Sequence, residues 1–202
     1  MKQDQLLLNV ENLKTYFFLD EGTVRALDGV DFSIYRGQTL GVVGESGCGK
    51  SVTARSILRI VTKPGRIVEG KITLHRLVDK KHGSTMTDLV NLTDLDPMGS
   101  MMRSLRGSEM ALVPQEPMAS LSPVYTIGNQ IMEAIILHQK VDKATARAKA
   151  IEMLDFVGFP HPKQRVDAYP FQLSGGLRQR AVIAMALSCH PSLLIADERP
   201  AS

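Results

Sequence analysis

The sequence predicts an α/β protein with a mostly parallel core sheet, a β-rich N-terminal part and a helical segment inserted before the last strand. Short apolar or alternating stretches occupy the first eighty residues, and a glycine-rich loop at 44–51 opens a helical pattern. Helical spacing then dominates from 127 to 187, before an apolar stretch at 193–196. Because strands alternate with helices, we expect the core strands to run mostly parallel.

The composition is that of an ordinary globular chain. It has 202 residues, of which 44% are hydrophobic and 22% charged, and its net charge of +3 is too small to indicate a nucleic-acid surface. The apolar run Ala181 to Leu187 is far shorter than the roughly 18 residues of a membrane span, and 6–10 is too short for a signal peptide. Cys48 and Cys189 cannot form a disulfide framework. We therefore expect a soluble protein of a reducing cytosol that binds no nucleic acid.

The first 104 residues are expected to form strands around one helix. Residues 30–34 alternate between apolar and polar, which is typical of a half-buried strand, and the apolar run 40–43 predicts a short buried strand. A helix is expected from Lys50 to the Pro64-Gly65 pair. Further strands are expected at 6–10, 14–18 and 70–77, with a polar excursion of low order over 80–104.

The second half is expected to place helices between two buried strands, 110–113 and 193–196. One helix is predicted from 127 to 138. A second is predicted to begin at the N-cap Asp142 and end at Gly158, and a third to begin near Ser174 and break at Pro191.

The loop before the expected first helix fits the phosphate-binding pattern G-x-x-x-x-G-K-[ST]. Its residues are Gly44, Glu45, Ser46, Gly47, Cys48, Gly49, Lys50 and Ser51. The glycines let the backbone curl so that successive N–H groups point at phosphate oxygens, and the helix N-terminus adds its dipole. Lys50 is predicted to hold the β- and γ-phosphates and the Ser51 hydroxyl to ligate Mg²⁺. The alternative, a glycine-rich turn with an incidental lysine, is disfavoured by the strand-loop-helix context.

Two carboxylates follow the apolar stretch 193–196. Asp197 and Glu198 stand at its carboxyl end, where open α/β sheets bind ligands. Asp197 is expected to reach the Mg²⁺ shell, and Glu198 to orient a water for attack on the γ-phosphorus. Acidic residues after a strand also serve as helix caps, so the pattern gains its meaning from the loop at 44–51.

A second anion site is predicted where Ser174-Gly175-Gly176 opens the third helix. Such a sequence is often only an N-cap with a flexible turn. Here it would present the Ser174 hydroxyl and free N–H groups at a second helix N-terminus. A γ-phosphate site so far along the chain from the first makes sense if the nucleotide of another subunit docks against it.

Together these motifs resemble the ATPase subunits of ATP-binding cassette (ABC) transporters. The matching parts are the Walker A loop at 44–51, the Q-loop at Gln115, the signature at 173–177 and the Walker B strand at 193–198, so the resemblance covers essentially the whole chain. The segments 105–107, 115–123 and 169–180 are similar to the peptide-importer subfamily of dipeptide and oligopeptide permeases. Nickel importers look much alike and remain an alternative.

The resemblance implies an ABC-type P-loop ATPase fold with an N-terminal antiparallel β subdomain. Residues 1–202 would form one partial ABC ATPase domain. Within it, 1–115 and 190–202 would make the β subdomain and nucleotide-binding core, and 116–189 the helical subdomain with the signature. Two such subunits would pair head to tail on ATP and Mg²⁺, against two transmembrane permease subunits. They would serve a periplasmic or extracellular peptide-binding protein indirectly, as peripheral subunits on the cytoplasmic face of the inner membrane.

The resemblance also implies the roles of individual residues. Gln115 would contact Mg²⁺ or the attacking water, and Glu198 would be the general base, with Lys50 the third expected catalytic residue. An aromatic residue near the first strand would stack on adenine. Counting from 12–13 places it at Phe17, with Tyr16 as the alternative and plain core packing as a competing interpretation.

The end of the sequence departs from the family pattern. The family continues the Walker B strand with a proline-threonine turn, a D-loop and a strand carrying a switch histidine. Here Glu198 is followed by Arg199 and the sequence stops at Ser202. We therefore expect a truncated chain without its C-terminal strands, which alone binds nucleotide weakly and hydrolyses it poorly. A non-hydrolysing remnant is the alternative function; a soluble cassette acting on DNA or ribosomes is disfavoured, because coiled-coil insertions and tandem cassettes are missing.

Overall fold

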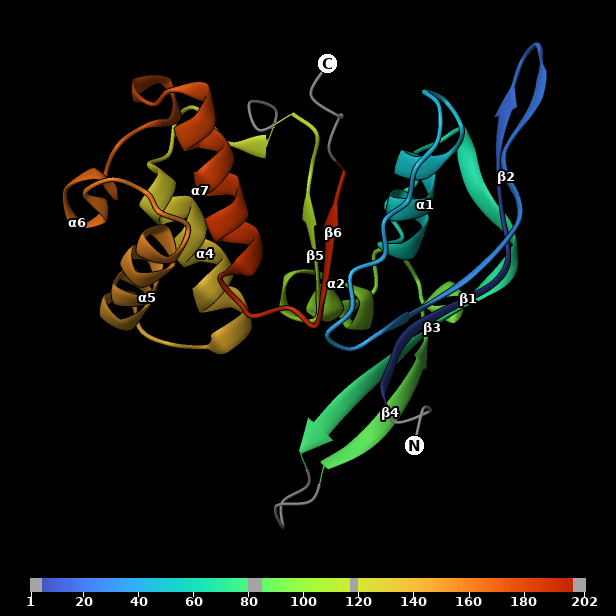
Figure 1. The fold of residues 1–202 in the computed structure, drawn as a ribbon, viewed down its shortest axis with the longest axis horizontal. Coiled ribbons are helices and arrows are strands. Elements are labelled where there is room, and N and C mark those ends of the chain that lie inside the picture. Colours follow the sequence, from blue (N-terminus) through green and yellow to red (C-terminus); the bar gives the residue numbers. More distant parts are fainter. Residues whose placement is uncertain (1–4, 80–84, 117–119, 198–202) are drawn as a thin grey trace. The chain divides into compact units, whose positions relative to one another are not determined.

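The computed structural model describes residues 5–79, 85–116 and 120–197 (Figure 1). The chain divides into two compact units, Met1–Arg103 and Ser104–Ser202. Each unit has a sheet of its own and is described separately. Among the described residues, no helix is both long and apolar enough to cross a bilayer.

The first unit is built on a four-stranded antiparallel sheet with the strand order β2-β1-β3-β4. Its strands are β1 (Leu6–Leu19), β2 (Gly22–Tyr35), β3 (Gly65–Asp79) and β4 (Thr85–Asn91). β1 and β2 form a long hairpin in which Leu19 pairs with Gly22, so the expected strands at 6–10 and 14–18 are one continuous strand. The antiparallel β subdomain implied by the resemblance is therefore present.

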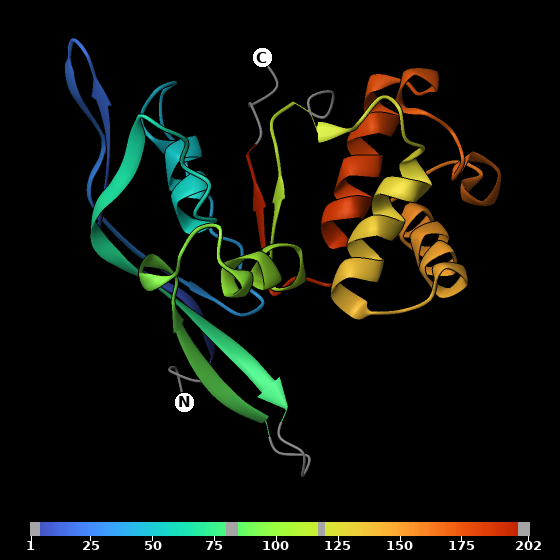
Figure 2. The ribbon, with the colours of Figure 1, turned by 180° about the vertical axis from the view of Figure 1, so that it is seen from behind.

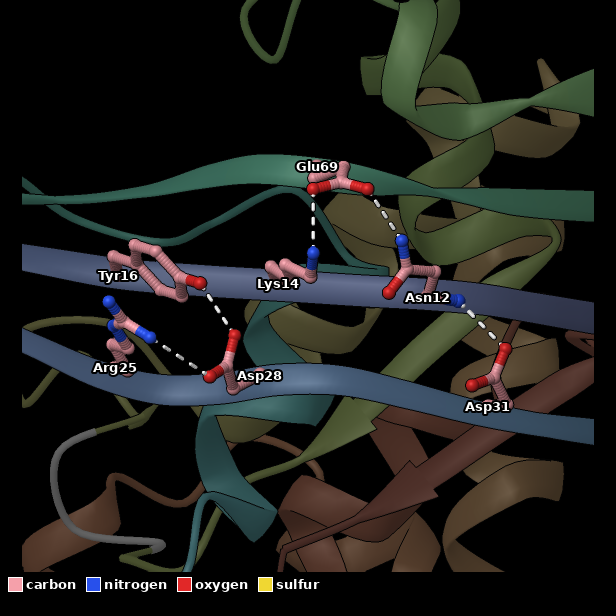
Figure 3. Close-up of polar contacts among 7 residues, drawn as sticks. All are labelled: Asn12, Lys14, Tyr16, Arg25, Asp28, Asp31 and Glu69. Carbon is pink, nitrogen blue, oxygen red and sulfur yellow. Dashed lines mark hydrogen bonds and ion pairs between the residues drawn. The ribbon is translucent and has the colours of Figure 1, made fainter.

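A bulge in the middle of β1 is stabilised by polar contacts from both neighbouring strands. Asn12 has φ 46°, and the β1–β2 register shifts between Val10 and Leu13. The Asn12 amide nitrogen donates to Asp31 at 2.8 Å, and its side chain donates to Glu69 at 2.6 Å (Figure 3). Lys14 adds an ion pair with Glu69 at 2.7 Å. These contacts hold the irregular strand in a single register.

Helix α1 (Lys50–Ile57) packs against the same sheet. Ser56 on α1 and Thr15 on β1 are both fully buried, and their hydroxyl oxygens lie 2.9 Å apart. Because side chains alternate along a strand, Thr15 faces away from the side that carries Lys14 and Tyr16. The helix therefore covers one face of the sheet, and the polar network of Figure 3 lies on the other.

Three expectations for the first unit are wrong. Helix α1 ends at Ile57, well before the predicted end at the Pro64-Gly65 pair. Residues 40–43 form no strand, and Val43 is 93% exposed. A strand requires a hydrogen-bonded neighbour, and none of the described strands pairs with this apolar run. The region 80–104 is also more ordered than expected. Beyond 80–84, which lie outside the described residues, it contains β4 and η2 (Leu92–Asp94) and the start of α2 (Ser100–Ser108).

The order of β4 comes from its pairing with β3. The register runs from Thr73 opposite Asn91 to Asp79 opposite Thr85, and Arg76 lies 3.4 Å from Asp88 across the pair. Because the hydrogen-bonding partner of β4 is β3, which lies outside 80–104, the polar composition of 80–104 alone could not indicate this strand.

The second unit combines a parallel strand pair with a helical cluster (Figure 2). β5 (Met110–Val113) pairs with β6 (Leu193–Ala196), which is the parallel pairing found among the described residues. The expected parallel core is thus represented by two strands, and the remaining strands are antiparallel. The other elements are α4 (Ile127–Gln139), α5 (Lys143–Phe156), α6 (Pro162–Arg165), η3 (Pro170–Gln172) and α7 (Gly175–Leu187).

Helices α4, α5 and α7 form where the caps and periodicity predict them. The Asp142 side chain accepts from the Thr145 amide at 2.9 Å at the start of α5, and Gly158 follows its end with φ 70°. One apolar cluster joins α4, α5 and α7, with Ile131, Ile135 and Leu154 almost fully buried. This packing holds the start of α7 in place.

Candidate functional site

The loop at 44–51 leads into α1 and wraps around the ammonium group of its own lysine. Gly47 and Gly49 have φ 85° and 95°, which favour glycine, and Gly49 is the N-cap of α1. Lys50 Nζ donates to the carbonyl oxygens of Gly44 and Glu45, each at 2.7 Å. The loop and helix halves of the predicted motif are confirmed, whereas the strand expected before them is not formed.

The second half of the loop is packed tightly, while its outer surface is open. A Cβ on Gly49 would lie 2.7 Å from the carbonyl oxygen of Ala26 on β2, so the helix N-terminus touches the sheet backbone. A Cβ on Gly44 would lie 2.6 Å from Cys48 Sγ, which places that side chain inside the curl of the loop. Residues 44–48 are exposed, so a ligand can reach the loop. The arrangement is a solvent-accessible backbone loop that surrounds the Lys50 ammonium group.

Gln115 and Asp197 follow two strands of the second unit that are paired with each other. Val113, the last residue of β5, is paired with Ala196, the last residue of β6. The Asp197 amide donates to the Val113 carbonyl at 2.9 Å, which extends the pairing to the start of the loop. Gln115 follows two residues after Val113 and is exposed. Polar side chains therefore follow both strands at their carboxyl ends, as expected for Asp197.

The strand that precedes Asp197 is less buried than expected. Of its four residues, Leu193 is buried, whereas Leu194 is 42% exposed. The sequence shows four apolar residues, but it does not show whether other segments cover both faces of the strand they form. Glu198 lies outside the described residues, so its position is not part of this geometry.

Ser174 caps α7 as predicted. Its hydroxyl oxygen accepts from the Leu177 amide at 3.4 Å, and the neighbouring Leu173 is buried. A Cβ on Gly175 or Gly176 would meet no atom within 4 Å, so the first turn of α7 is open on its outside. The structure thus presents a capped, accessible helix N-terminus at the predicted signature.

The two aromatic candidates on β1 have different surroundings. The Tyr16 hydroxyl donates to Asp28 at 2.5 Å, and this bond lowers the pKa of Asp28 and raises that of Tyr16 (Figure 3). The Phe17 ring lies against the backbone of β3, because a Cβ on Gly65 would be 2.6 Å from a ring carbon. Tyr16 is therefore engaged in the polar network, and Phe17 is not part of it.

Comparison with known proteins agrees with these features. Residues 27–201 match the ABC transporter family profile. The probable peptide ABC transporter ATP-binding protein y4tR of Sinorhizobium fredii (strain NBRC 101917 / NGR234) is 48% identical over 193 residues, which are 96% of this chain and 53% of that protein. The oligopeptide transport ATP-binding protein AppD of Bacillus subtilis (strain 168) is also 48% identical over 193 residues, with 95% and 54% covered. The chain spans about half the length of these relatives.

Solved structures share the fold. Two dimeric structures of the bacterial ABC transporter cassette MJ0796, one of them bound to ADP and Pi, have TM-scores of 0.77 and 0.76. Each is 23% identical in sequence, and the match covers 94% of this chain and 73% of the cassette chain. The likeness confirms the ABC ATPase fold class. Motifs, fold and family profile agree, and the chain belongs to the ABC transporter family, with similarity to the ATP-binding subunits of its peptide-transport members.

Proposed function

We propose that this chain is the nucleotide-binding part of an ATPase that powers the import of peptides through an ABC transporter. The observation that carries the proposal is the position of the Lys50 ammonium, which is held by two carbonyl oxygens inside an open glycine loop. A terminal phosphate offers anionic oxygens to the same ammonium, and the attraction between opposite full charges is an energy that a neutral carbonyl oxygen does not supply. Phosphate can therefore replace the carbonyl oxygens as the partner of Lys50.

The other expected site residues suit ATP and Mg²⁺. The Ser51 hydroxyl and the Asp197 carboxylate are the hard oxygen ligands that Mg²⁺ prefers. When bound, Mg²⁺ neutralises charge that develops on the transferred phosphoryl group. In this proposal Gln115 orients the attacking water and Glu198 takes its proton. General-base assistance contributes typically about 10²–10⁴ in rate.

The assembly we propose uses both anion sites. Phe17 stacks on the adenine, because Tyr16 is already bonded to Asp28. The open N-terminus at Ser174 contacts the γ-phosphate of a second ATPase subunit in a head-to-tail dimer. In this proposal 1–115 and 190–202 act as the nucleotide-binding core and 116–189 as the helical subdomain. The dimer lies peripherally on the cytoplasmic face of the inner membrane and contacts two permease subunits. A peptide-binding protein delivers peptides to these permease subunits.

The test is nucleotide binding and hydrolysis by the full gene product. Lys50→Ala should weaken binding of a fluorescent ATP analogue at least about 100-fold, whereas the exposed Lys71→Ala serves as a matched loss of one positive charge and should bind as the unmodified protein does. Glu198→Gln should retain ATP, release phosphate about 10²–10⁴ times more slowly and accumulate as a dimer. Normal binding by Lys50→Ala would refute the site, and normal turnover by Glu198→Gln would refute the base.

The cargo is tested separately by transport. The peptide-transport names of the relatives favour di- and oligopeptides. Deleting the gene in its host should abolish uptake of labelled short peptides, and the Lys50→Ala gene should fail to restore it. Loss of nickel uptake with peptide uptake intact would show that the alternative cargo is correct.

A further inference from the structure

Gln115 lies in the sequence between two residues that are buried in the helical core. Val113, before it, and Leu121, after it, are 4% and 6% exposed and belong to the same apolar cluster as α4, α5 and α7. Between these anchors Gln115 is exposed, and the Ser120 hydroxyl donates to the Glu116 carbonyl at 3.2 Å. The position of Gln115 therefore depends on how firmly each end is held.

The second anchor is reinforced by one side chain on the first turn of α4. The Ser122 amide donates to Gln130 Oε1 at 2.8 Å, and Gln130 Nε2 donates to the Ser122 carbonyl at 3.1 Å. The same Nε2 donates to the Tyr125 carbonyl at 3.0 Å. Both ends of the amide are thus used, and the backbone on either side of Pro123 is tied to the helix.

Only a side chain with this length, one acceptor and two donors can make these bonds. A glutamate keeps the acceptor for the Ser122 amide but has no hydrogen for the two carbonyl oxygens at neutral pH. A methionine has a similar length and fills the half-buried space without any strong bond. The contacts of Gln130 are therefore separable from its packing.

We infer that Gln130 is a positioning residue for hydrolysis, because it fixes the segment after Gln115 to α4 and so holds Gln115 where it meets the attacking water. The inference rests on the proposed ATPase function. In this inference Gln130 acts through Gln115 and has no direct contact with the nucleotide or the water. Without the three bonds, Ser122 and Tyr125 are no longer tied to α4, and Leu121 is held by its apolar contacts alone, so the chain after Gln115 is held less firmly. A misplacement of about 1 Å caused away from the chemistry can lower a rate about 100-fold.

The experiment compares two glutamines at opposite ends of α4. Gln139 donates to the Ser188 carbonyl at 3.0 Å and accepts from Lys149, so Gln139→Met also removes amide bonds from this helix, but far from the segment. In the full gene product, kcat and KM for MgATP and amide hydrogen exchange over 114–126 are measured for both variants. Gln130→Met should lower kcat about 10- to 100-fold, leave KM within about twofold and speed exchange at Ser122. Gln139→Met should leave kcat within about twofold.

The outcomes separate the inference from the function beneath it. An unmodified protein that does not hydrolyse ATP overturns the proposed function, and this inference with it. If it hydrolyses ATP but Gln130→Met does so equally fast, or Gln139→Met loses as much, only the positioning role is overturned. Gln130→Glu provides the same comparison if Gln130→Met does not fold. It keeps the Ser122 amide bond and should lose part of kcat with an unchanged KM.

Discussion

Comparing Gly49→Ala with Gly47→Ala should separate two requirements that the P-loop glycines meet, a left-handed backbone conformation and a close approach to another strand. Gly47 and Gly49 both have a positive φ, at 85° and 95°. A Cβ on Gly47 would meet nothing within 4 Å, whereas one on Gly49 would lie 2.7 Å from the Ala26 carbonyl oxygen and 2.8 Å from a Leu27 methyl carbon. Gly47→Ala therefore tests the backbone conformation alone, and Gly49→Ala tests conformation and close approach together.

The structure sets the size of the difference. Left-handed backbone costs a residue with a Cβ about 1–2 kcal/mol, which applies to both variants. In Gly49→Ala, α1 must also move away from β2 by about 0.7 Å to restore an ordinary 3.4 Å contact with the Ala26 oxygen. Overpacking of this kind typically costs about 1–3 kcal/mol. We expect losses of about 1–2 kcal/mol for Gly47→Ala and about 2–5 kcal/mol for Gly49→Ala.

The assay is urea unfolding followed by far-UV circular dichroism, because the chain contains no tryptophan. The midpoint should fall for both variants and further for Gly49→Ala, with an unchanged slope. Equal losses in the two variants would show that α1 does not press on β2 at this point, and would refute the reasoning.

Two further predictions concern contacts away from the loop. Ser56→Ala leaves the buried Thr15 hydroxyl without its partner and should reduce the free energy of unfolding by about 1–3 kcal/mol. The double variant with Thr15→Val should lose less stability than the sum of the two single variants. Strictly additive losses in urea unfolding would contradict this coupling. The bidentate bond to Arg147 lowers the pKa of Asp167 in the folded protein. The stabilisation from this pair is therefore complete above the ordinary carboxyl pKa of about 3.9, and it is lost as pH falls through the lower pKa of the folded state. Asp167→Asn should therefore flatten the decline of the urea midpoint below about pH 4, and parallel curves for the two proteins would contradict the pairing.

Much of the site could be predicted because its motifs consist of residues that are close together in the sequence. The glycine spacing from Gly44 to Gly49 and the lysine after it specify a loop and a helix start within eight residues. Likewise, Asp142 and Ser174 cap helices through atoms only three residues away. Such bonds depend on neighbours along the chain, so sequence patterns indicate them reliably.

Other features could not be predicted because a distant segment supplies the partner. The apolar run 40–43 has strand composition but no described strand beside it, whereas the polar stretch 85–91 becomes β4 because β3 offers it a register. Gln130 is an unremarkable polar position in a helical pattern until its three bonds to the preceding segment are seen. The sequence carries no signal for this role beyond an amide side chain near the start of a helix.

The family, the phosphate-binding loop and the helix caps follow from the sequence, because each motif that indicates them is a short stretch of neighbouring residues. The pairing of the strands, the shared edge that Gln115 and Asp197 follow, and the need for a small residue at Gly49 where α1 touches β2 depend on the tertiary structure. Pairing and close approach join atoms that are far apart in the chain, and their free energy appears only when the fold brings those atoms together.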